Sequence, residues 1–157
     1  MLDYCVNLFQ DIDLIVYGRK TYELMIPYWP DVIKDPTSTK AEVEFAQAFD
    51  AIDKVVFSRT LDKIEENARI VHDNPGDEIR RLKEQPGKKI AVGGVSLPEQ
   101  LIALGLVDEF DFIIHPIIAG EGRRLLEGTN LQERLNLKLV DSKVLKSGIV
   151  VLHYLKQ

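Results

Sequence analysis

The sequence predicts an α/β fold, with a mostly parallel central sheet and a C-terminal antiparallel hairpin. Short apolar runs alternate with segments of helical periodicity as far as residue 114, which is the pattern of a parallel sheet covered by helices. The last two apolar runs, 137–145 and 149–155, are separated only by a turn at Ser147-Gly148, as in a hairpin. Helices on both faces of the sheet would give three layers.

Each expected element has a local reason in the sequence. Apolar side chains at helical spacing mark the helices, as Leu2, Val6 and Phe9 do at the N-terminus. Strands are expected where short apolar runs end in glycine or in polar residues. The expected helices are 2–10, 19–26, 41–52, 77–84 and 96–104, and the expected strands are 13–17, 54–57, 68–71, 89–92, 110–114, 137–145 and 149–155.

Several boundaries carry specific signals. Thr39 and Glu42 have the spacing of a capping box at the start of a helix. Asp77 is expected to be the N-cap of the helix that follows it. The prolines in segment 27–30 end the preceding helix, because proline cannot continue it. Residues 31–38 are therefore expected to form a loop.

Composition limits the function classes. The chain has 157 residues, of which 45% are hydrophobic and 29% charged, so we expect one domain over 1–157. A net charge of −5 with mixed signs argues against nucleic-acid and membrane partners, and any basic site must be local. We expect no signal peptide, and no apolar run is long enough to span a bilayer. Cys5 is the only cysteine, which fits the reducing cytoplasm, and the three histidines lack metal-ligand spacing.

The segment 14–23 is the most informative part of the chain. An apolar run ends at Gly18, where a backbone without a Cβ can turn sharply, and Arg19 and Lys20 then open a helix. A helix start offers free backbone N–H groups and a partial positive charge, to which the two cations add. The segment therefore predicts a phosphate site, although a solvated helix start would have the same residues.

Two other expected strands end in comparable segments, 58–60 and 93–96. The first is Ser-Arg-Thr and the second Gly-Gly-Val-Ser. If the three strands are parallel, all three segments lie at one edge of the sheet, where such sheets bind ligands. They could hold a dinucleotide with an additional phosphate on the arginines, whose planar side chains pair with phosphate oxygens. The spacing is not the G-x-G-x-x-G of Rossmann domains.

On segments 14–23, 55–60, 93–97 and 116–122, the chain resembles the dihydrofolate-reductase-like family. Within that family it is most similar to the branch that contains the reductase domain of the bifunctional riboflavin-biosynthesis deaminase–reductase. The resemblance covers essentially the whole chain in order. It implies the three-layer fold of the family and an NADPH-dependent reductase that transfers hydride to a small heterocycle, either pterin/dihydrofolate-like or a riboflavin-precursor pyrimidine. It also implies a homodimer as the common assembly.

The resemblance also assigns roles to the three strand ends. Segment 18–21 would hold the pyrophosphate and the adenosine 2′-phosphate, and segment 58–59 would flank that phosphate and the adenine. Segment 93–96 would cradle the pyrophosphate and extend toward the nicotinamide. The implied cofactor-binding residues are Gly18, Arg19, Lys20, Thr21, Ser58, Arg59, Gly93, Gly94, Val95 and Ser96.

The catalytic proton donor is not defined by the motifs. By its position before Gly18, Asp3 is the candidate that the resemblance implies, but from the residues alone we favour its interpretation as a helix cap or a first-turn charge. Three aromatic side chains could stack on a flat substrate or anchor the core. They are Tyr22, Tyr28 and Trp29. His115 precedes a proline at a strand end and is expected to be structural.

Two functions from different classes stay open at this point. The first is the NADPH-dependent reductase, and the second is a catalytically inactive domain that binds NADPH or another nucleotide. Both predict NADPH binding, whereas a purely structural domain would not bind it. They differ in whether any heterocycle oxidises the bound cofactor.

The last expectation concerns a missing element. In the proteins that the chain resembles, a first strand and loop precede the helix that starts here near Leu2, and that strand lies between the strand ending at Gly93 and strand 110–114. Without that strand, the backbone groups of the two flanking strands would be buried and unpaired, which is costly. Three options avoid this cost. The flanking strands pair directly, another subunit supplies a strand, or the chain is part of a longer protein, which is the option we expect.

Overall fold

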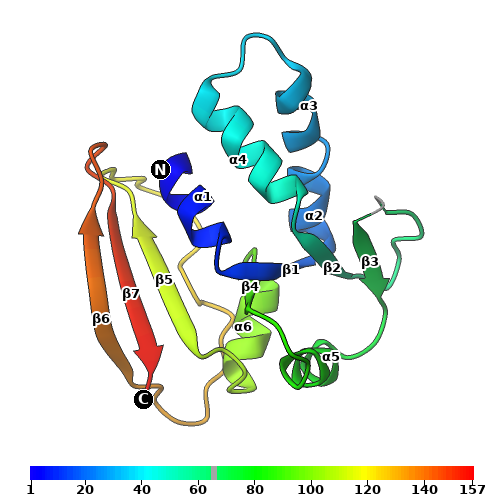
Figure 1. Ribbon diagram of the computed structural model, residues 1–157. Coiled ribbons are helices and arrows are strands. Elements are labelled where there is room, and N and C mark those ends of the chain that lie inside the picture. Colours follow the sequence, from blue (N-terminus) through cyan, green and yellow to red (C-terminus); the bar gives the residue numbers. More distant parts are fainter. Residues whose placement is uncertain (65–66) are drawn as a thin grey trace. The chain divides into compact units, whose positions relative to one another are not determined.

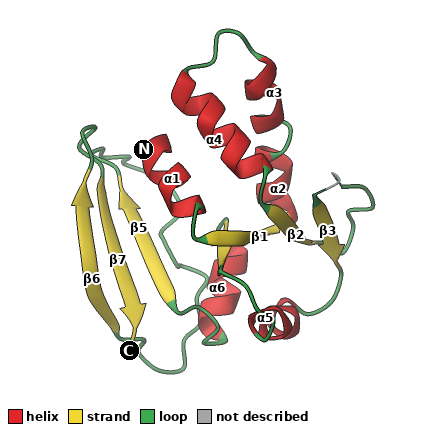
Figure 2. Cartoon of the chain, viewed as in Figure 1, coloured by secondary structure: helices red, strands yellow, loops and turns green. Residues whose placement is uncertain are grey.

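The computed structural model describes residues 1–64 and 67–157, and it has the expected α/β class (Figures 1 and 2). The helices are α1 (Leu2–Phe9), α2 (Arg19–Met25), α3 (Trp29–Lys34), α4 (Lys40–Asp50), α5 (Pro75–Lys83) and α6 (Ser96–Ala103). The strands are β1 (Ile12–Gly18), β2 (Asp53–Phe57), β3 (Ala68–Val71), β4 (Lys89–Gly93), β5 (Glu109–Ile114), β6 (Leu137–Val144) and β7 (Val150–Lys156). The chain divides into two compact units, Leu2–Leu97 and Pro98–Gln157 with Met1.

The first unit contains a four-stranded sheet in the order β3-β2-β1-β4. All three pairings are parallel. At the carboxyl ends, Gly18 lies opposite Phe57, Phe57 opposite Val71, and Tyr17 opposite Gly93. The four strands therefore end along the same edge of the sheet.

Helices on one face of this sheet build the core of the first unit. In Figure 1, α4 lies above the sheet and α5 below it. The Phe45 ring lies 6.2 Å from Phe49 and 4.3 Å from Trp29, measured between centroids. Packing of these rings removes apolar surface from water, and such burial is the main favourable contribution to folding. The buried residues of the cluster are Ile12, Ile15, Tyr17, Tyr22, Ile26, Phe45, Phe49, Ile52 and Val56.

The helix caps confirm one prediction and correct another. At the start of α4, the Thr39 backbone N–H donates to Glu42 Oε2 at 2.8 Å, and the Glu42 N–H donates to Thr39 Oγ1 at 3.4 Å. The capping box is therefore confirmed. At α5 the N-cap is Asn74, whose Oδ1 accepts from the Gly76 N–H at 2.8 Å. The prediction of Asp77 as the cap was wrong, because proline at the first helical position lets the helix start two residues earlier.

The prediction of a loop at 31–38 was also wrong for residues 31–34, which are helical. Helix α3 occupies Trp29–Lys34, with Pro30 in its first turn. Proline is tolerated there because the first-turn N–H groups have no partner within the helix. The same residue type that ends α2 therefore also starts α3.

The second unit contains an antiparallel sheet in the order β5-β7-β6. The predicted hairpin is confirmed, with Val144 opposite Val150 and Gly148 in the left-handed region at φ +82°. The strands thus form two sheets, whereas the sequence predicted one sheet with an antiparallel edge. Strands β4 and β5, which would flank the missing strand, belong to different sheets, so the option that they pair directly was wrong. In the part of the chain that the structure describes, no helix has the length and apolar character needed to cross a membrane.

Tyr17 gives a pH-dependent test of the core. Tyr17 is 6% exposed, and burial raises the pKa of its phenol to about 12. Because the folded state keeps this proton where the unfolded chain loses it, stability falls as the pH rises from 10 toward 12. Between pH 9 and pH 11.5, the wild-type free energy of unfolding is expected to fall by about 2 kcal/mol more than that of Tyr17→Phe.

Urea unfolding of both proteins at the two pH values measures this difference. Other groups that titrate in this range are present in both proteins, so their contributions cancel in the comparison. Parallel pH profiles would show that the Tyr17 phenol ionises in the folded state as readily as in the unfolded chain.

Candidate functional site

The three segments predicted to bind a ligand lie at one edge of the parallel sheet. Strand β1 is central, and segments 18–21, 58–60 and 93–96 follow or include the carboxyl ends of β1, β2 and β4. The expectation that these strands are parallel is confirmed. We call this set of three segments the strand-end edge.

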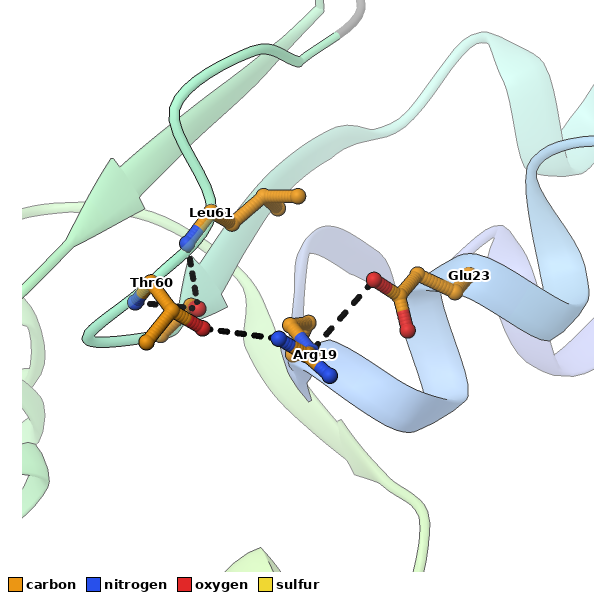
Figure 3. Close-up of polar contacts among 5 residues, drawn as sticks. Arg19, Glu23, Thr60 and Leu61 are labelled. Atoms are coloured by element: carbon orange, nitrogen blue, oxygen red, sulfur yellow. Dashed lines mark hydrogen bonds and ion pairs between the residues drawn. The ribbon is translucent and has the colours of Figure 1, made fainter.

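Arg19 connects two of the three segments. Its Nη1 donates to Thr60 Oγ1 at 2.7 Å, and its Nε lies 3.3 Å from Glu23 Oε1 (Figure 3). The Arg19 side chain is 44% exposed, so these contacts contribute little to stability. They do fix the position of the guanidinium, whose Nη2 has no partner among the described residues. A fixed guanidinium with an available N–H group is suited to a phosphate oxygen.

Ser58 and Arg59 have different surroundings within the second segment. Ser58 is 9% exposed, and its Oγ accepts from the backbone N–H groups of Thr60 at 3.2 Å and Leu61 at 3.0 Å. Its hydroxyl therefore shapes the turn. Arg59 is exposed, as is Lys20 at the start of α2. The edge thus presents three exposed cations in a chain whose net charge is −5.

Gly18 differs from the expectation that it makes a sharp turn. Its backbone is extended, with φ −80° and ψ 157°, a conformation that any residue adopts. A Cβ added at Gly18 would meet no described atom within 4 Å. The glycine is therefore not required by the backbone or by packing, and the space beside it is open to a ligand that must come close to the main chain.

Gly93 and Gly94, in contrast, are required by the fold. A Cβ at Gly93 would lie 2.0 Å from Cε1 of the Tyr17 ring. Gly94 has φ +93°, and a Cβ there would lie 2.4 Å from Thr21 Oγ1. Thr21 therefore packs against the third segment, and a cofactor role for the two glycines stays a prediction.

The other predicted site residues are in varied environments. Val95 is 44% exposed and Ser96 begins α6. Asp3 lies in the first turn of α1 and is exposed, and no hydrogen bond or ion pair joins it to the described residues of the strand-end edge. Its role as proton donor stays a prediction. His115 follows β5 in the second unit, and its carbonyl oxygen accepts from the Ile117 N–H at 2.8 Å.

The aromatic candidates divide between core and surface. Tyr22 is 6% exposed, and Trp29 packs on Phe45, so both belong to the core. Tyr28 is 54% exposed and lines a surface pocket of about 410 Å³ together with Asp31. Within the described ranges, no three His, Cys, Asp or Glu side chains are grouped so as to hold a metal ion.

Sequence reasoning missed His72. It directly follows β3, and its Nδ1 lies 2.6 Å from the carbonyl oxygen of Ser58. The only signal in the sequence was its place after a strand that was correctly predicted at 68–71. The strand-end edge therefore continues onto the end of β3.

A parallel sheet with exposed cations and open backbone at its carboxyl edge places this chain in the class of α/β folds whose usual ligand site is at the strand ends. The chain belongs to the RibD C-terminal domain family, which matches residues 3–151. The resemblance to the riboflavin-biosynthesis branch is therefore confirmed.

Two curated relatives come from Bacillus subtilis (strain 168). The uncharacterized protein YyaP is 38% identical over 162 residues, covering 98% of this chain and 83% of the relative. The uncharacterized protein YwjB is 24% identical over 137 residues, covering 84% of this chain and 68% of the relative. The 38% identity to the first of these is enough to place the two chains in one family.

Two solved structures share the fold. A putative riboflavin biosynthesis protein from Shewanella sp. PV-4 has a TM-score of 0.72 at 19% identity, covering 97% of this chain and 78% of that one. A pyrimidine reductase-like protein from Corynebacterium diphtheriae has a TM-score of 0.61 at 17% identity, covering 99% and 80%. These likenesses confirm the fold expected from the sequence.

Proposed function

We propose that the protein is an NADPH-dependent reductase that transfers hydride to a small heterocycle, either pterin/dihydrofolate-like or a riboflavin-precursor pyrimidine. The observation that carries this proposal is the strand-end edge, where three segments with cations and glycines converge on parallel strands. Membership in the RibD C-terminal domain family supports it. The names of the two structural neighbours, a riboflavin biosynthesis protein and a pyrimidine reductase-like protein, point to the same chemistry.

The residues at this edge fit the phosphates of NADPH. The open space beside Gly18 would admit the pyrophosphate close to the main chain, where a Cβ would otherwise obstruct it. Arg19, Lys20 and Arg59 are exposed cations that would pair with the 2′-phosphate. When bound, NADPH supplies the hydride, and the protein holds the cofactor and orients it. Asp3 remains our proposed proton donor.

The charges of this edge lead us to expect a preference for NADPH over NADH. Removing Arg19 or Arg59 by substitution with alanine is expected to weaken NADPH binding by ~1.5–3 kcal/mol, the scale of a hydrogen bond to a charged group. NADH binding should change little, because NADH lacks the 2′-phosphate. Fluorescence titration of each variant with both cofactors measures the two affinities.

Lys34→Ala is the matched control for these variants. It removes an exposed cation that pairs only weakly with Asp31, at 4.0 Å, and that lies on α3, outside the strand-end edge. Its cofactor affinities should match the wild type. Equal losses of NADPH and NADH binding in the Arg19 and Arg59 variants would show that the arginines do not recognise the additional phosphate.

The reductase activity itself is tested in two stages. The protein is first titrated with NADPH and NADH, and a panel of pterins and riboflavin-precursor pyrimidines is then screened for oxidation of the cofactor by absorbance. Turnover with one of the two heterocycle classes supports the proposal and selects the substrate. Binding without any turnover would identify an inactive nucleotide-binding domain, and the absence of binding would contradict both functions.

A further inference from the structure

His72 completes the row of strand ends on the parallel sheet. Strand β3 pairs with β2 so that Val71 lies opposite Phe57, and the Ser58 N–H donates to the Val71 carbonyl oxygen at 3.1 Å. The residues that directly follow these two strands are Ser58 and His72, and both therefore lie at the same edge of the sheet.

The contact between these two residues has a defined direction. His72 Nδ1 lies 2.6 Å from the Ser58 carbonyl oxygen. A carbonyl oxygen can only accept a hydrogen bond, so Nδ1 must carry the hydrogen that it donates. The Ser58 main chain is thus held from β3 by one side chain as well as by the sheet.

From Ser58 the hydrogen bonds continue to the end of β1. Ser58 Oγ accepts from the N–H groups of Thr60 and Leu61, and Thr60 Oγ1 accepts from Arg19 Nη1 at 2.7 Å (Figure 3). A connected series of hydrogen bonds therefore extends from His72 to Arg19. It crosses the ends of three strands and passes through the turn that carries Arg59.

We propose that His72 is a positioning residue for recognition of the adenosine 2′-phosphate. Its Nδ1–H donates to the Ser58 carbonyl oxygen and so fixes the turn that follows Ser58. That turn carries Arg59, and its Thr60 hydroxyl accepts the hydrogen bond from Arg19. This inference rests on the proposed function, because it concerns the preference of the same site for NADPH. His72 acts through the turn and does not itself contact the phosphate.

Three substitutions separate this role from the alternatives. Asparagine places an amide N–H close to the position of the histidine Nδ1, so His72→Asn keeps a donor for the Ser58 carbonyl. Glutamine extends further and places its amide nearer to the position of Nε2, so His72→Gln keeps the distal nitrogen. His72→Leu provides neither donor.

The experiment measures the dissociation constants of NADPH, NADH and adenosine 2′,5′-bisphosphate for the wild type and the three variants. We expect His72→Leu to weaken NADPH and bisphosphate binding about tenfold while changing NADH binding less than about twofold. His72→Asn should restore NADPH affinity to within about threefold of the wild type. A residue that only supports the fold would not change the ratio of the NADPH and NADH affinities.

Three results would overturn the role of His72. They are an unchanged NADPH affinity in His72→Leu, equal losses for both cofactors, and recovery in His72→Gln but not in His72→Asn, which would indicate direct contact through Nε2. Thermal unfolding of each variant verifies that the protein is folded at the assay temperature. Each of these three results requires a wild type that binds NADPH, so it would overturn the role of His72 and leave the proposed function standing. A wild type that binds neither cofactor would reject the proposed function and this inference together.

Discussion

Gly18→Val is expected to lower NADPH affinity by at least about a hundredfold while the protein stays folded. The backbone at Gly18 is extended and a Cβ there meets no described atom within 4 Å, so valine fits the free protein without strain. The same side chain would occupy the open space through which the pyrophosphate is proposed to approach the main chain. Isothermal titration with NADPH, together with circular dichroism of the free protein, measures both effects.

Two further substitutions act as controls for this result. Gly18→Ala adds a smaller side chain and should give an intermediate loss of affinity. Gly94→Val is expected to destabilise the protein itself, because Gly94 is at φ +93° and a Cβ would lie 2.4 Å from Thr21 Oγ1. The cofactor-binding role that the resemblance implies for Gly94 would instead predict a Gly94→Val protein that folds and loses only NADPH binding. Normal NADPH binding by Gly18→Val would show that the pyrophosphate does not lie beside Gly18.

Lys54→Met is expected to lower the free energy of unfolding by about 2–5 kcal/mol. Lys54 is 1% exposed, and its Nζ donates to the carbonyl oxygens of Phe49 at 2.9 Å, Asp50 at 3.4 Å and Ile52 at 2.7 Å. It thereby donates to two carbonyl groups in the last turn of α4 and to one just beyond it, where a helix end needs donors from outside the helix. Methionine fills a similar volume but removes the three hydrogen bonds that the ammonium donates.

Lys54→Arg is the matched comparison, because it retains a cation that can donate to several carbonyl groups. It should lose less stability than Lys54→Met in urea unfolding at pH 7. Burial lowers the pKa of the Lys54 ammonium, while Asp50 and Asp53 act in the opposite direction. A Lys54→Met protein as stable as the wild type would show that water replaces the ammonium as donor to the helix end.

The local structure was predictable because it depends on neighbours in the sequence. Strand 68–71 has the predicted bounds, and the capping box at Thr39 and Glu42 formed as expected. Pro30 and Asn74 show the limit of such signals. Proline both ends and starts helices, and two capping residues can compete for the same helix, so the boundary depends on which first turn packs better.

The division into two sheets could not be predicted from local patterns. Pairing between strands depends on contacts between distant parts of the sequence, and both β4 and β5 are apolar runs of the expected kind. The periodicity of a strand indicates that it will pair but does not specify its partner. The sequence therefore predicted the strands and their directions better than their assignment to sheets.

The site was predictable to the extent that it follows strand ends. The strand-end edge required only that β1, β2 and β4 be parallel. His72 was missed because its neighbour Ser58 is 14 residues away, and only the register of β2 with β3 brings the two together. The different roles of Gly18 and Gly94 depend on Thr21 and on the backbone angles, which no spacing encodes.

Strand β1 has a partner strand on each side, and this has a consequence for how the site binds. A central strand of a parallel sheet opens only when the whole unit unfolds, whereas edge strands open by local fluctuations. Gly18 is the last residue of this central strand, so its backbone is already ordered before any ligand arrives. The conformational entropy of this part of the site is lost during folding, and binding there needs little further ordering.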